Sequence, residues 1–545
     1  MIAAGGSPAA PSSGGYDAIV IGSGFGGAMV AHELVHAGRR VLMLERGDWV
    51  ERGPHNWEST SARELSPHFS PETPYEVVNG RRRGTTGAFY GVGGPSVFYG
   101  GVALRMRVED FDPGPEIVAG SDAAWPFDYD ALEPYYSRAE GLLGVAGDDR
   151  GDPTAPPRSA PYPFPPSPLS APGRRIAEAA HSLGLSPFQL PLAINYEERE
   201  GRAACVRCTT CDGFACAVGA KNDLATGILP HLISKGLELR ANAVVTRLVE
   251  EGGRIVAVEY VDRRSGDRHR VHAEQVVLAA GALASPHLVL ASGLEGLSPA
   301  PHAVGRYLMR HRNSIVFGLF PSRTNRAAEF HKQVAIHDFY LGAPGGPPGK
   351  LGAIQQITAP GAGFVKSVLP APWGQLVAPG MPYGLGMLTI AEDQPQVANG
   401  VAIDPSRPDR FGLPRLVVTH HYTRRDVAAG RTLLRQAVRI LRRAGALVYA
   451  SYEIKTFSHA VGTMRMGADP RTSVLDEHGR YRGVDNLWVA DGSVLPTAGG
   501  VNPSLTIAAC ALRVGAHLAG TAHAGRAATS RRALPTLASS RAHGG

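Results

Sequence analysis

Apolar and small residues near the start of the chain follow the pattern of a strand, a helix and a second strand. DAIVIG, residues 17–22, is a short apolar run suited to a strand buried in a parallel sheet. Beyond a glycine-rich turn, small and apolar side chains recur at helical spacing at Ala28, Ala31, Leu34 and Val35. Gly38 is typical of a helix end, and VLMLE, residues 41–45, predicts the next strand. The pattern predicts a βαβ unit over residues 16–47.

Two later apolar runs predict strands that can join the same sheet. They are QVVLAAG, residues 275–281, and NLWVADGS, residues 486–493. Residues 275–294 form a stretch of twenty residues without a charge at neutral pH, which raises the question of a membrane span. The Gly, Ser, Pro and His residues in its middle instead indicate a strand, a turn and the start of a helix. We therefore expect a nucleotide-binding sheet assembled from distant segments.

The segments between these strands have another character. Residues 153–172 are rich in proline and predict a semi-rigid surface connection. Runs such as VAIHDFYL and LGAIQQIT, within residues 314–422, are separated by Gly/Pro turns, which favours antiparallel sheet. Residues 424–446 predict an amphipathic helix with one apolar face and a solvated basic face. The fold class expected is α/β, with a Rossmann-like part and an α+β part built on an antiparallel sheet.

Composition and charge exclude few functions. The chain has 545 residues, a formal net charge of +7 and 43% hydrophobic residues, which is ordinary for a globular protein of more than one domain. So mild an excess of positive charge predicts a solvated surface and no nucleic-acid partner. The first residues lack the pattern of a secretory signal, so we expect a cytoplasmic protein without a membrane span. Residues 1–14 and 521–545 are expected to be disordered.

Glycines between the first strand and helix predict a dinucleotide site. Gly22, Gly24 and Gly27 form G-x-G-x-x-G, which permits the tight turn, the approach of a pyrophosphate and close helix packing. Glu45 ends the second strand, where an acid can bind the adenosine ribose. A second glycine block at residues 91–101, which NAD domains do not need, favours FAD. Asp491, at a strand end, can hold a polyol chain such as the ribityl of FAD.

Five blocks of the chain together resemble the glucose–methanol–choline (GMC) flavin oxidoreductases. In order they are GSGFGG…LERG, GVGGPSVFYGG, GALASPHLVLASGL, SHAVGTMRMG and NLWVADGSVLPTAGGVNPSLT. The resemblance implies a two-domain enzyme that oxidises the CH–OH group of an alcohol, with His459 as base and Asn502 as its partner. The residues expected to contact FAD are Gly22, Ser23, Gly24, Phe25, Gly26, Gly27, Glu45, Arg46, Gly93, Gly94, Ser96, Val245, Asp491, Gly492, Asn502 and Pro503.

The proposed pair suits the chemistry. An alcohol is a poor hydride donor until its hydroxyl loses a proton, and a neutral histidine can accept that proton. A carboxamide can donate an N–H group to the developing alkoxide. Some members of the family attach FAD through a histidine in the block at residues 91–101. Here Phe98 and Tyr99 occupy that region, so we expect non-covalent FAD.

The resemblance leaves the substrate and the electron acceptor open. The expected substrate is a sugar, glycoside, polyol or secondary alcohol, and the acceptor is dioxygen or another carrier. A non-redox lyase that holds FAD on the same fold is one rival, and a basic scaffold protein is another. By the family pattern, residues 15–110, 203–312 and 455–520 form the FAD-binding domain. Residues 111–202 and 313–454 form the substrate-binding domain.

Four cysteines lie within twelve residues, in the spacing C-x2-C-x2-C-x4-C, at Cys205, Cys208, Cys211 and Cys216. Ferredoxins use a similar spacing, but their fourth cysteine comes one residue earlier. An iron–sulfur cluster here would make the protein a dehydrogenase that passes electrons through the Cys205–Cys216 loop. The alternative is that the thiols are small packing groups or form a disulfide. We expect no metal site and leave the cluster as the alternative.

Overall fold

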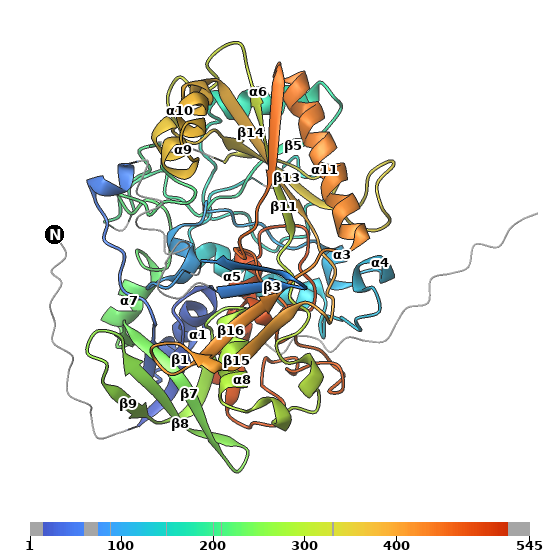
Figure 1. Ribbon diagram of the computed structural model, residues 1–545. Coiled ribbons are helices and arrows are strands. Elements are labelled where there is room, and N and C mark those ends of the chain that lie inside the picture. The colour runs from blue at the N-terminus through green and yellow to red at the C-terminus, as the bar shows by residue number, and fades with distance from the viewer. Residues whose placement is uncertain are drawn as a thin grey trace, which may run out of the picture.

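The computed structural model describes residues 15–58, 75–87, 89–148, 150–199, 201–208, 210–329 and 332–521. The leader expected at residues 1–14 lies outside the described residues, and so does the expected tail except for Thr521. Two large sheets organise the described chain, one at each end of an elongated molecule (Figure 1).

The first sheet is parallel and has the strand order β18-β10-β1-β2-β6. Its strands are β1 (Tyr16–Ile21), β2 (Val41–Leu44), β6 (Glu238–Arg240), β10 (Ala273–Leu278) and β18 (Leu487–Val489). Strands β2 and β18 and the carboxyl-terminal parts of β1 and β10 are apolar and buried, because helices and loops cover both faces of a parallel sheet. The sequence prediction of a sheet built from distant segments is confirmed.

Helices pack closely on this sheet. α1 (Phe25–His36) contacts α12 (Ser504–Ala519), and α12 in turn contacts α5 (Tyr129–Leu142). The α1–α12 contact depends on Gly515, because a Cβ there would lie 2.9 Å from the Glu33 side chain and 3.1 Å from the Val30 backbone. The twenty-residue uncharged stretch folds as β10, a turn and α8 (Ala284–Ala291), as predicted. Within the described residues, no helix is both long and apolar enough to cross a membrane.

The second sheet is antiparallel and has the order β17-β11-β14-β13-β12-β5. Its strands are β5 (Pro187–Gln189), β11 (Arg312–Leu319), β12 (Val334–Ile336), β13 (Gly352–Thr358), β14 (Gly384–Ala391) and β17 (Val448–Glu453). The run VAIHDFYL is strand only in its first three residues, because a turn bonded from Tyr340 N–H to His337 C=O follows. The rest of that predicted strand is wrong.

The predicted amphipathic helix is α11 (Arg424–Arg443), and its apolar face packs on the second sheet. The Thr423 side chain accepts a hydrogen bond from the Asp426 N–H group, and Asp426 bonds back to the Thr423 N–H group, which starts the helix. α6 (Ala171–His181) lies beside α11. α9 (Ala362–Val368), α10 (Trp373–Val377) and the 3-10 helix η6 (Ala378–Tyr383) project at one side of this sheet (Figure 1).

Two small sheets complete the fold. One contains β7 (Ala243–Glu251), β8 (Arg254–Asp262) and β9 (Arg268–Val271); the other has the order β15-β16-β3-β4. The bounds of the latter are β3 (Tyr75–Asn79), β4 (Arg82–Thr86), β15 (Gly400–Pro408) and β16 (Pro414–Thr419). Strands β15 and β16 come from the segment expected in the substrate-binding domain, yet they share an apolar cluster with Leu283 and Leu308 of the FAD-binding segments.

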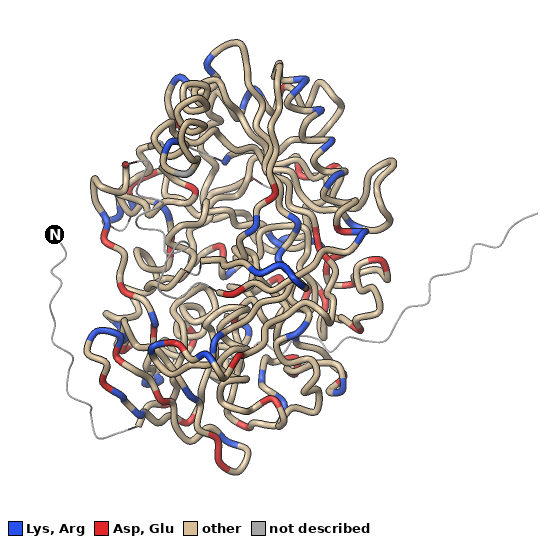
Figure 2. Tube along the Cα trace, viewed as in Figure 1, with Lys and Arg blue, Asp and Glu red and all other residues tan. Residues whose placement is uncertain are grey.

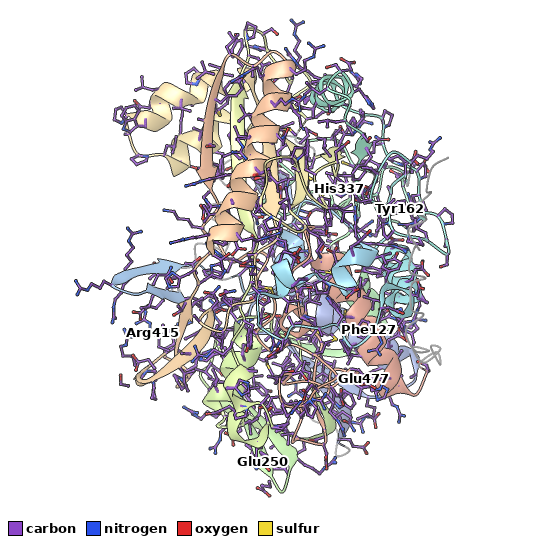
Figure 3. All side chains as sticks on the ribbon, turned by 90° about the vertical axis from the view of Figure 1, so that its right-hand side faces the viewer. Phe127, Tyr162, Glu250, His337, Arg415 and Glu477 are labelled. Atoms are coloured by element: carbon purple, nitrogen blue, oxygen red, sulfur yellow. The ribbon has the colours of Figure 1, made fainter. Side chains whose placement is uncertain are left out.

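The remaining elements are short. They are α3 (Val108–Phe111), α4 (Pro115–Val118), α7 (Ile228–Ser234), η1 (Pro54–Trp57), η3 (Gly94–Val97), η4 (Glu295–Leu297), η5 (Pro301–Ala303) and η7 (Gly492–Val494). Lys and Arg residues are interspersed with Asp and Glu residues along the chain (Figure 2). His337 is buried in the interior of the molecule, whereas Arg415 and Glu250 lie at its outer edge (Figure 3).

Candidate active site

A single cavity of about 1170 Å³ connects the two large sheets. At one end it is lined by the loops that follow the parallel strands, including residues 21–26 and 279–284. At the other end it is lined by β11, β13, β14 and the α9–η6 segment. Ligands of open α/β sheets bind at the carboxyl ends of the strands, which is where this cavity begins.

The glycine-rich turn leaves open space at the start of α1. A Cβ atom at Gly24 would meet no heavy atom within 4 Å, whereas one at Gly27 would lie 1.9 Å from the Gly22 carbonyl oxygen. No side chain caps α1 at Gly24, and its first turn contains no acidic residue. The first N–H groups of the helix are therefore available for an anion. Space, backbone donors and the cavity together fit the pyrophosphate of a dinucleotide.

Glu45 lies at the end of β2 and faces the same region. Its carboxylate accepts hydrogen bonds from the Ser23 N–H (3.1 Å), the Ser23 hydroxyl (2.6 Å) and the Gly47 N–H (2.8 Å). Burial raises the pKa of Glu45 above its ordinary value. Oε1 accepts only one of these bonds, so it retains an acceptor position for a ligand hydroxyl.

Asp491 is also buried at the cavity wall, but its carboxylate is fully used by the protein. It accepts hydrogen bonds from the Gly281 N–H, the Ser285 hydroxyl, and the N–H and hydroxyl of Ser493, at distances of 2.5–2.8 Å. Burial raises the pKa of Asp491. A carboxylate has about four acceptor positions. Asp491 therefore shapes the wall at this point, and no acceptor position remains for a polyol chain.

Most of the residues expected to contact the cofactor line this cavity. They are Gly22, Ser23, Gly24, Phe25, Gly26, Glu45, Arg46, Gly94, Val245, Asp491, Gly492, Asn502 and Pro503. Gly27, Gly93 and Ser96 lie behind the wall. The Gly93 N–H group donates to the Ser23 hydroxyl (3.0 Å), and the Ser96 hydroxyl donates to the Gly93 carbonyl (2.6 Å), so these two residues hold the second glycine block against the first.

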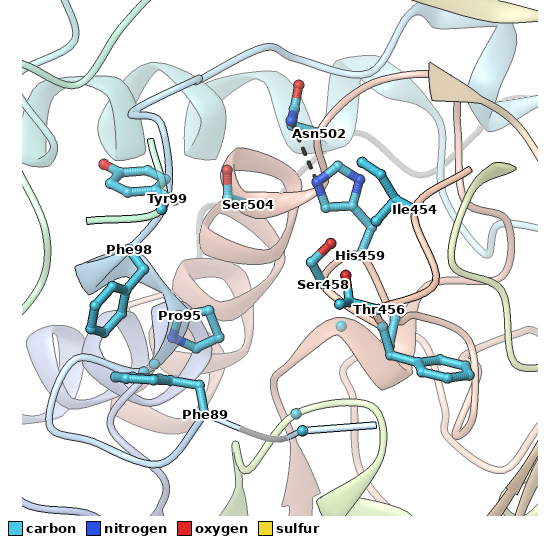
Figure 4. A pocket seen from close by; sticks show the side chains of 18 of the residues that line it. Phe89, Pro95, Phe98, Tyr99, Ile454, Thr456, Ser458, His459, Asn502 and Ser504 are labelled. Atoms are coloured by element: carbon cyan, nitrogen blue, oxygen red, sulfur yellow. Dashed lines mark hydrogen bonds between the residues drawn. The ribbon is translucent and has the colours of Figure 1, made fainter. Parts of the chain in front are cut away.

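His459 and Asn502 meet at the junction between the two ends of the cavity (Figure 4). The Asn502 Nδ2 atom lies 3.5 Å from the His459 Nε2 atom. Phe98 and Tyr99 lie across the pocket from this pair. Burial lowers the pKa of His459 well below its usual range, and the neighbouring His311 and Lys332 side chains lower it further. His459 is therefore a neutral imidazole at neutral pH.

A second histidine lies directly behind His459. The His311 Nδ1 atom is 3.0 Å from the His459 Nδ1 atom, and the two rings are nearly perpendicular, at 87°. On the other side of the His311 ring, Nε2 lies 2.9 Å from the Gly499 carbonyl oxygen and 3.2 Å from the Ala498 carbonyl oxygen. His311 is buried and has a left-handed backbone, with φ of +59°.

The loop that carries Asn502 is held by buried polar side chains. Gln355 in β13 places its Nε2 atom 2.7 Å from the Asn502 Oδ1 atom. The Gly499 N–H group donates to the Glu392 carboxylate (3.0 Å), and the Gly500 N–H group donates to the Tyr340 hydroxyl (2.7 Å). A Cβ at Gly500 would lie 2.6 Å from the Gly352 Cα atom, so only glycine fits there. The loop is thereby fixed relative to the second sheet.

Sequence reasoning did not find His311, Asn313, Lys332 or Gln355. His311 lies at the end of a segment expected in the FAD-binding domain, the other three lie in the segment expected in the substrate-binding domain, and no motif singles them out. His311, Asn313 and Gln355 reach the site because the ends of β11 and β13 both flank β14, at the register Arg312–Ala391 and Gly352–Ala391. Lys332 precedes β12, which pairs with β13.

The four clustered cysteines lie near the cavity, and Cys211 lines it. None of the five cysteines is in a disulfide, and all five are among the described residues. Across the described ranges, no three His, Cys, Asp or Glu residues come together in a group that could hold a metal ion. Burial raises the pKa of Cys205 to about 11 and that of Cys211 to about 12. These thiols are protonated at neutral pH.

A glycine-rich dinucleotide cradle that opens onto a histidine–asparagine pair defines an FAD-dependent oxidoreductase. Models of the GMC oxidoreductase family match residues 164–313 and 395–511. The chain is 34% identical to 6'''-hydroxyparomomycin C oxidase of Streptomyces lividus, over 94% of this chain and 93% of that protein. It is 30% identical to 2-methyl-1,2-propanediol dehydrogenase of Mycolicibacterium austroafricanum, over 92% and 95% of the two chains.

The fold agrees with this assignment. The crystal structure of pyridoxine 4-oxidase from Mesorbium loti superposes with a TM-score of 0.66 at 20% identity and covers 92% of this chain and 99% of that chain. The protein belongs to the GMC oxidoreductases, as the five sequence blocks predicted. Its cofactor is FAD, and the α/β fold with a second, antiparallel sheet is confirmed.

Proposed function

We propose that the protein oxidises the CH–OH group of an alcohol to an aldehyde or ketone, with His459 as general base and Asn502 as its partner. The observation that carries the proposal is the 3.5 Å contact between Asn502 Nδ2 and His459 Nε2, inside a cavity continuous with the glycine cradle. Bound FAD supplies the hydride acceptor. His459 takes the alcohol proton, and a carbonyl product would remain once that acceptor had taken the carbinol hydride.

Hydrogen bonds behind His459 determine which of its nitrogens can act as the base. Two backbone carbonyls surround His311 Nε2, so that nitrogen carries a hydrogen and donates it. In neutral His311, Nδ1 then has a lone pair and accepts a hydrogen bond from His459 Nδ1–H. The neutral ring of His459 therefore has its lone pair on Nε2, which faces Asn502. This tautomer can take a proton from a substrate in the cavity.

The Asn313 side chain is compatible with this tautomer of His459 when the oxygen and nitrogen of its amide are exchanged. Its Nδ2 atom lies 3.4 Å from His459 Nδ1, while its Oδ1 atom is buried without a partner. Amide oxygen and nitrogen are distinguished only by their hydrogen bonds. Turning the amide places Oδ1 against His459 Nδ1–H, which satisfies the oxygen and adds a second acceptor for the same hydrogen. With its amide turned in this way, Asn313 is compatible with the Nδ1–H tautomer that His311 favours.

The orientation of Asn502 follows from the same chain of donors. Since His459 Nε2 is an acceptor, the Asn502 NH₂ group faces it and its Oδ1 atom faces Gln355, which donates (2.7 Å). The NH₂ group has two hydrogens, so one can bind the alcohol oxygen as negative charge develops there. Gln355 and His311 act through this pair and are positioning residues.

The FAD is proposed to be bound non-covalently. Residues 91–101 contain no histidine, and Phe98 and Tyr99 occupy the region where a linking histidine stands in some family members. The substrates in view remain a sugar, glycoside, polyol or secondary alcohol, with dioxygen or another carrier as electron acceptor. The relatives' names support this range: one is an oxidase and one a dehydrogenase of a diol.

Other predictions from the sequence stay predictions. These are the cytoplasmic location, the absence of a nucleic-acid partner and the two-domain division. Packing of β15, β16 and α5 with the FAD-binding elements favours moving residues 400–419 and part of 111–202 to that domain. No observation in the structure favours electron transfer through the Cys205–Cys216 loop or a lyase reaction, and both remain the alternatives.

The test is anaerobic reduction of the purified flavoprotein by a panel of alcohols, followed by its absorbance. We expect the wild-type flavin to bleach with at least one alcohol, and His459→Ala to retain FAD but bleach at least a hundredfold more slowly. Dithionite should bleach both proteins equally, which controls for access to the flavin. Wild-type rates in His459→Ala would remove the histidine from the role, and a flavin that no alcohol reduces would favour the lyase.

A further inference from the structure

The wall that the second sheet presents to the cavity is apolar. Side chains from three of its strands and from α9 line it together, at Ile315, Phe317, Ile357, Phe364, Val365 and Leu388. We call these six residues the apolar chamber. They lie on the side of the cavity away from the glycine cradle, next to His459 and Asn502. A substrate whose hydroxyl reaches the pair extends its remaining atoms into this chamber.

The uncharged polar residues that line the same end of the cavity are Asn313, Thr358, Ser451, Tyr452, Thr456 and Ser458. The charged residues that line this part of the cavity within the described chain are Lys332 and Asp212, and they form an ion pair with each other. Thr358 has a buried hydroxyl without a partner. Substrate hydroxyl groups that lie against the six side chains of the apolar chamber would have no hydrogen-bond partner among them, which costs free energy for each group. A hydrocarbon body in the same place avoids that cost.

The mouth of the chamber is apolar too. Leu369 and Val377 line the cavity and are 38% and 39% exposed. Beside them on α10, Trp373 and Leu376 are 64% and 66% exposed. Clustered exposed apolar side chains are uncommon on a globular surface and mark sites where an apolar ligand or partner binds. Because Leu369 and Val377 lie both at the surface and on the cavity lining, an apolar molecule would find apolar contacts from the surface to the chamber.

We propose that, within the alcohol oxidation proposed above, the substrate is a mainly hydrocarbon alcohol with a single reacting hydroxyl, and not a sugar or polyol. The inference rests on that proposed function for the reaction. The prediction that the apolar chamber binds a hydrocarbon body depends only on its lining residues and not on the proposed reaction. Each methylene moved from water into an apolar chamber contributes about 0.8 kcal/mol, a factor of about four in affinity.

Two homologous series test the proposal. For secondary 2-alkanols from 2-propanol upward, kcat/KM should rise about fourfold per methylene until the chamber is filled, and glycerol and sorbitol should be far poorer substrates. Tertiary 2-methyl-2-alkanols have no carbinol hydrogen and cannot be oxidised. Their dissociation constants, measured by calorimetry on the flavoprotein, should fall by the same factor per methylene. This second series reports binding without turnover.

Variants locate the effect. Phe364→Ser should reduce the gain per methylene for the longer alcohols, and Leu369→Ser at the rim should weaken binding of the longest members about fivefold. Leu447→Ser is the matched control, because Leu447 is 69% exposed and does not line the cavity. Since Leu369 is itself at the surface, its replacement should leave the fold intact even if Phe364→Ser does not.

The outcomes separate the two proposals. A flat or falling series together with efficient oxidation of polyols would overturn the hydrocarbon substrate and leave alcohol oxidation standing. A rising series of tertiary alcohol affinities, with no flavin reduction by any alcohol, would support the chamber and overturn the proposed reaction. A methylene gain that survives unchanged in both Phe364→Ser and Leu369→Ser would show that the chamber is not where the chain binds.

Discussion

Replacing His311 by Leu removes the acceptor behind His459 and tests the directed chain of hydrogen bonds. In the native protein the His459 Nδ1–H group donates to His311 Nδ1 at 3.0 Å, in a buried setting. A buried donor left without a partner costs about 1–3 kcal/mol. His459 can avoid this cost by moving its hydrogen to Nε2, where it can no longer accept a proton from the alcohol.

The expected loss in kcat/KM is therefore about fivefold to 150-fold, because 1.36 kcal/mol corresponds to a factor of ten. Asn313 can accept the same hydrogen, so we expect the loss in kcat/KM to lie toward the lower end of this range. His311→Asn is the matched variant: its Oδ1 atom can stand in for the lost Nδ1 acceptor, and asparagine tolerates the left-handed backbone at φ +59°. It should recover most of the activity that His311→Leu loses.

The assay combines kinetics with spectroscopy. Nitrogen NMR of protein labelled with ¹⁵N-histidine should show His459 protonated on Nδ1 in the wild type and in His311→Asn, and a mixture of tautomers in His311→Leu. His459→Ala identifies the signal. Thermal unfolding and FAD content separate this effect from loss of structure. If His311→Leu keeps the wild-type tautomer and the wild-type kcat/KM, the reasoning from the carbonyls of Ala498 and Gly499 is refuted.

The remaining predictions concern charge, orientation, cofactor and metal. Because His459 acts in its neutral form and its pKa is lowered, kcat/KM should fall on the acidic side only below about pH 6.5. Lys332→Met removes a charge that lowers this pKa, so the fall should move to higher pH. The exposed Lys366→Met is the control and should not move it. Gln355→Leu should lower kcat about a hundredfold with FAD retained, since Asn502 loses its orientation; a change in KM alone would argue against this. Gly24→Ala should lower the FAD content per chain while the unfolding temperature of the FAD-free protein stays unchanged, with Gly141→Ala as the control; full FAD content would contradict the cradle. Iron and acid-labile sulfide should be far below one atom per chain. Stoichiometric amounts would support the alternative of a dehydrogenase that passes electrons through an iron–sulfur cluster.

Local conformational demands explain what could be predicted from the sequence. The turn at Gly22 has a positive φ of +104°, and there is no room for a Cβ atom at Gly27. Both positions require glycine, so the glycine motif in the sequence predicts the local backbone geometry. The apolar runs of β1, β2 and β10 likewise record burial on both faces. These signals were sufficient to predict the parallel sheet and the glycine-rich turn, whereas the choice of FAD also used the glycine block at residues 91–101 and the family came from the resemblance of five blocks.

The pair His459 and Asn502 could be named only through the resemblance to a family, since a lone histidine carries no signal of its role. Asp491 shows the limit of reasoning by position. Its place at a strand end was predicted correctly, but its hydrogen bonds to Gly281, Ser285 and Ser493 were not visible in the sequence. The strand VAIHDFYL was cut short for a similar reason, because the turn at Tyr340 serves the Asn502 loop.

The sequence by itself therefore determined most of the elements and the glycine-rich turn, because each depends on neighbours within one strand, turn or helix, and the class of enzyme followed from the resemblance of five blocks to a family. Only the tertiary structure decided which nitrogen of His459 faces the substrate, what orients Asn502 and what kind of body the chamber accepts. Those properties depend on His311, Gln355 and the chamber side chains, which the register of β11, β13 and β14 brings together. The physical reason is that hydrogen-bond direction and cavity polarity belong to contacts between distant segments, and no local pattern encodes them.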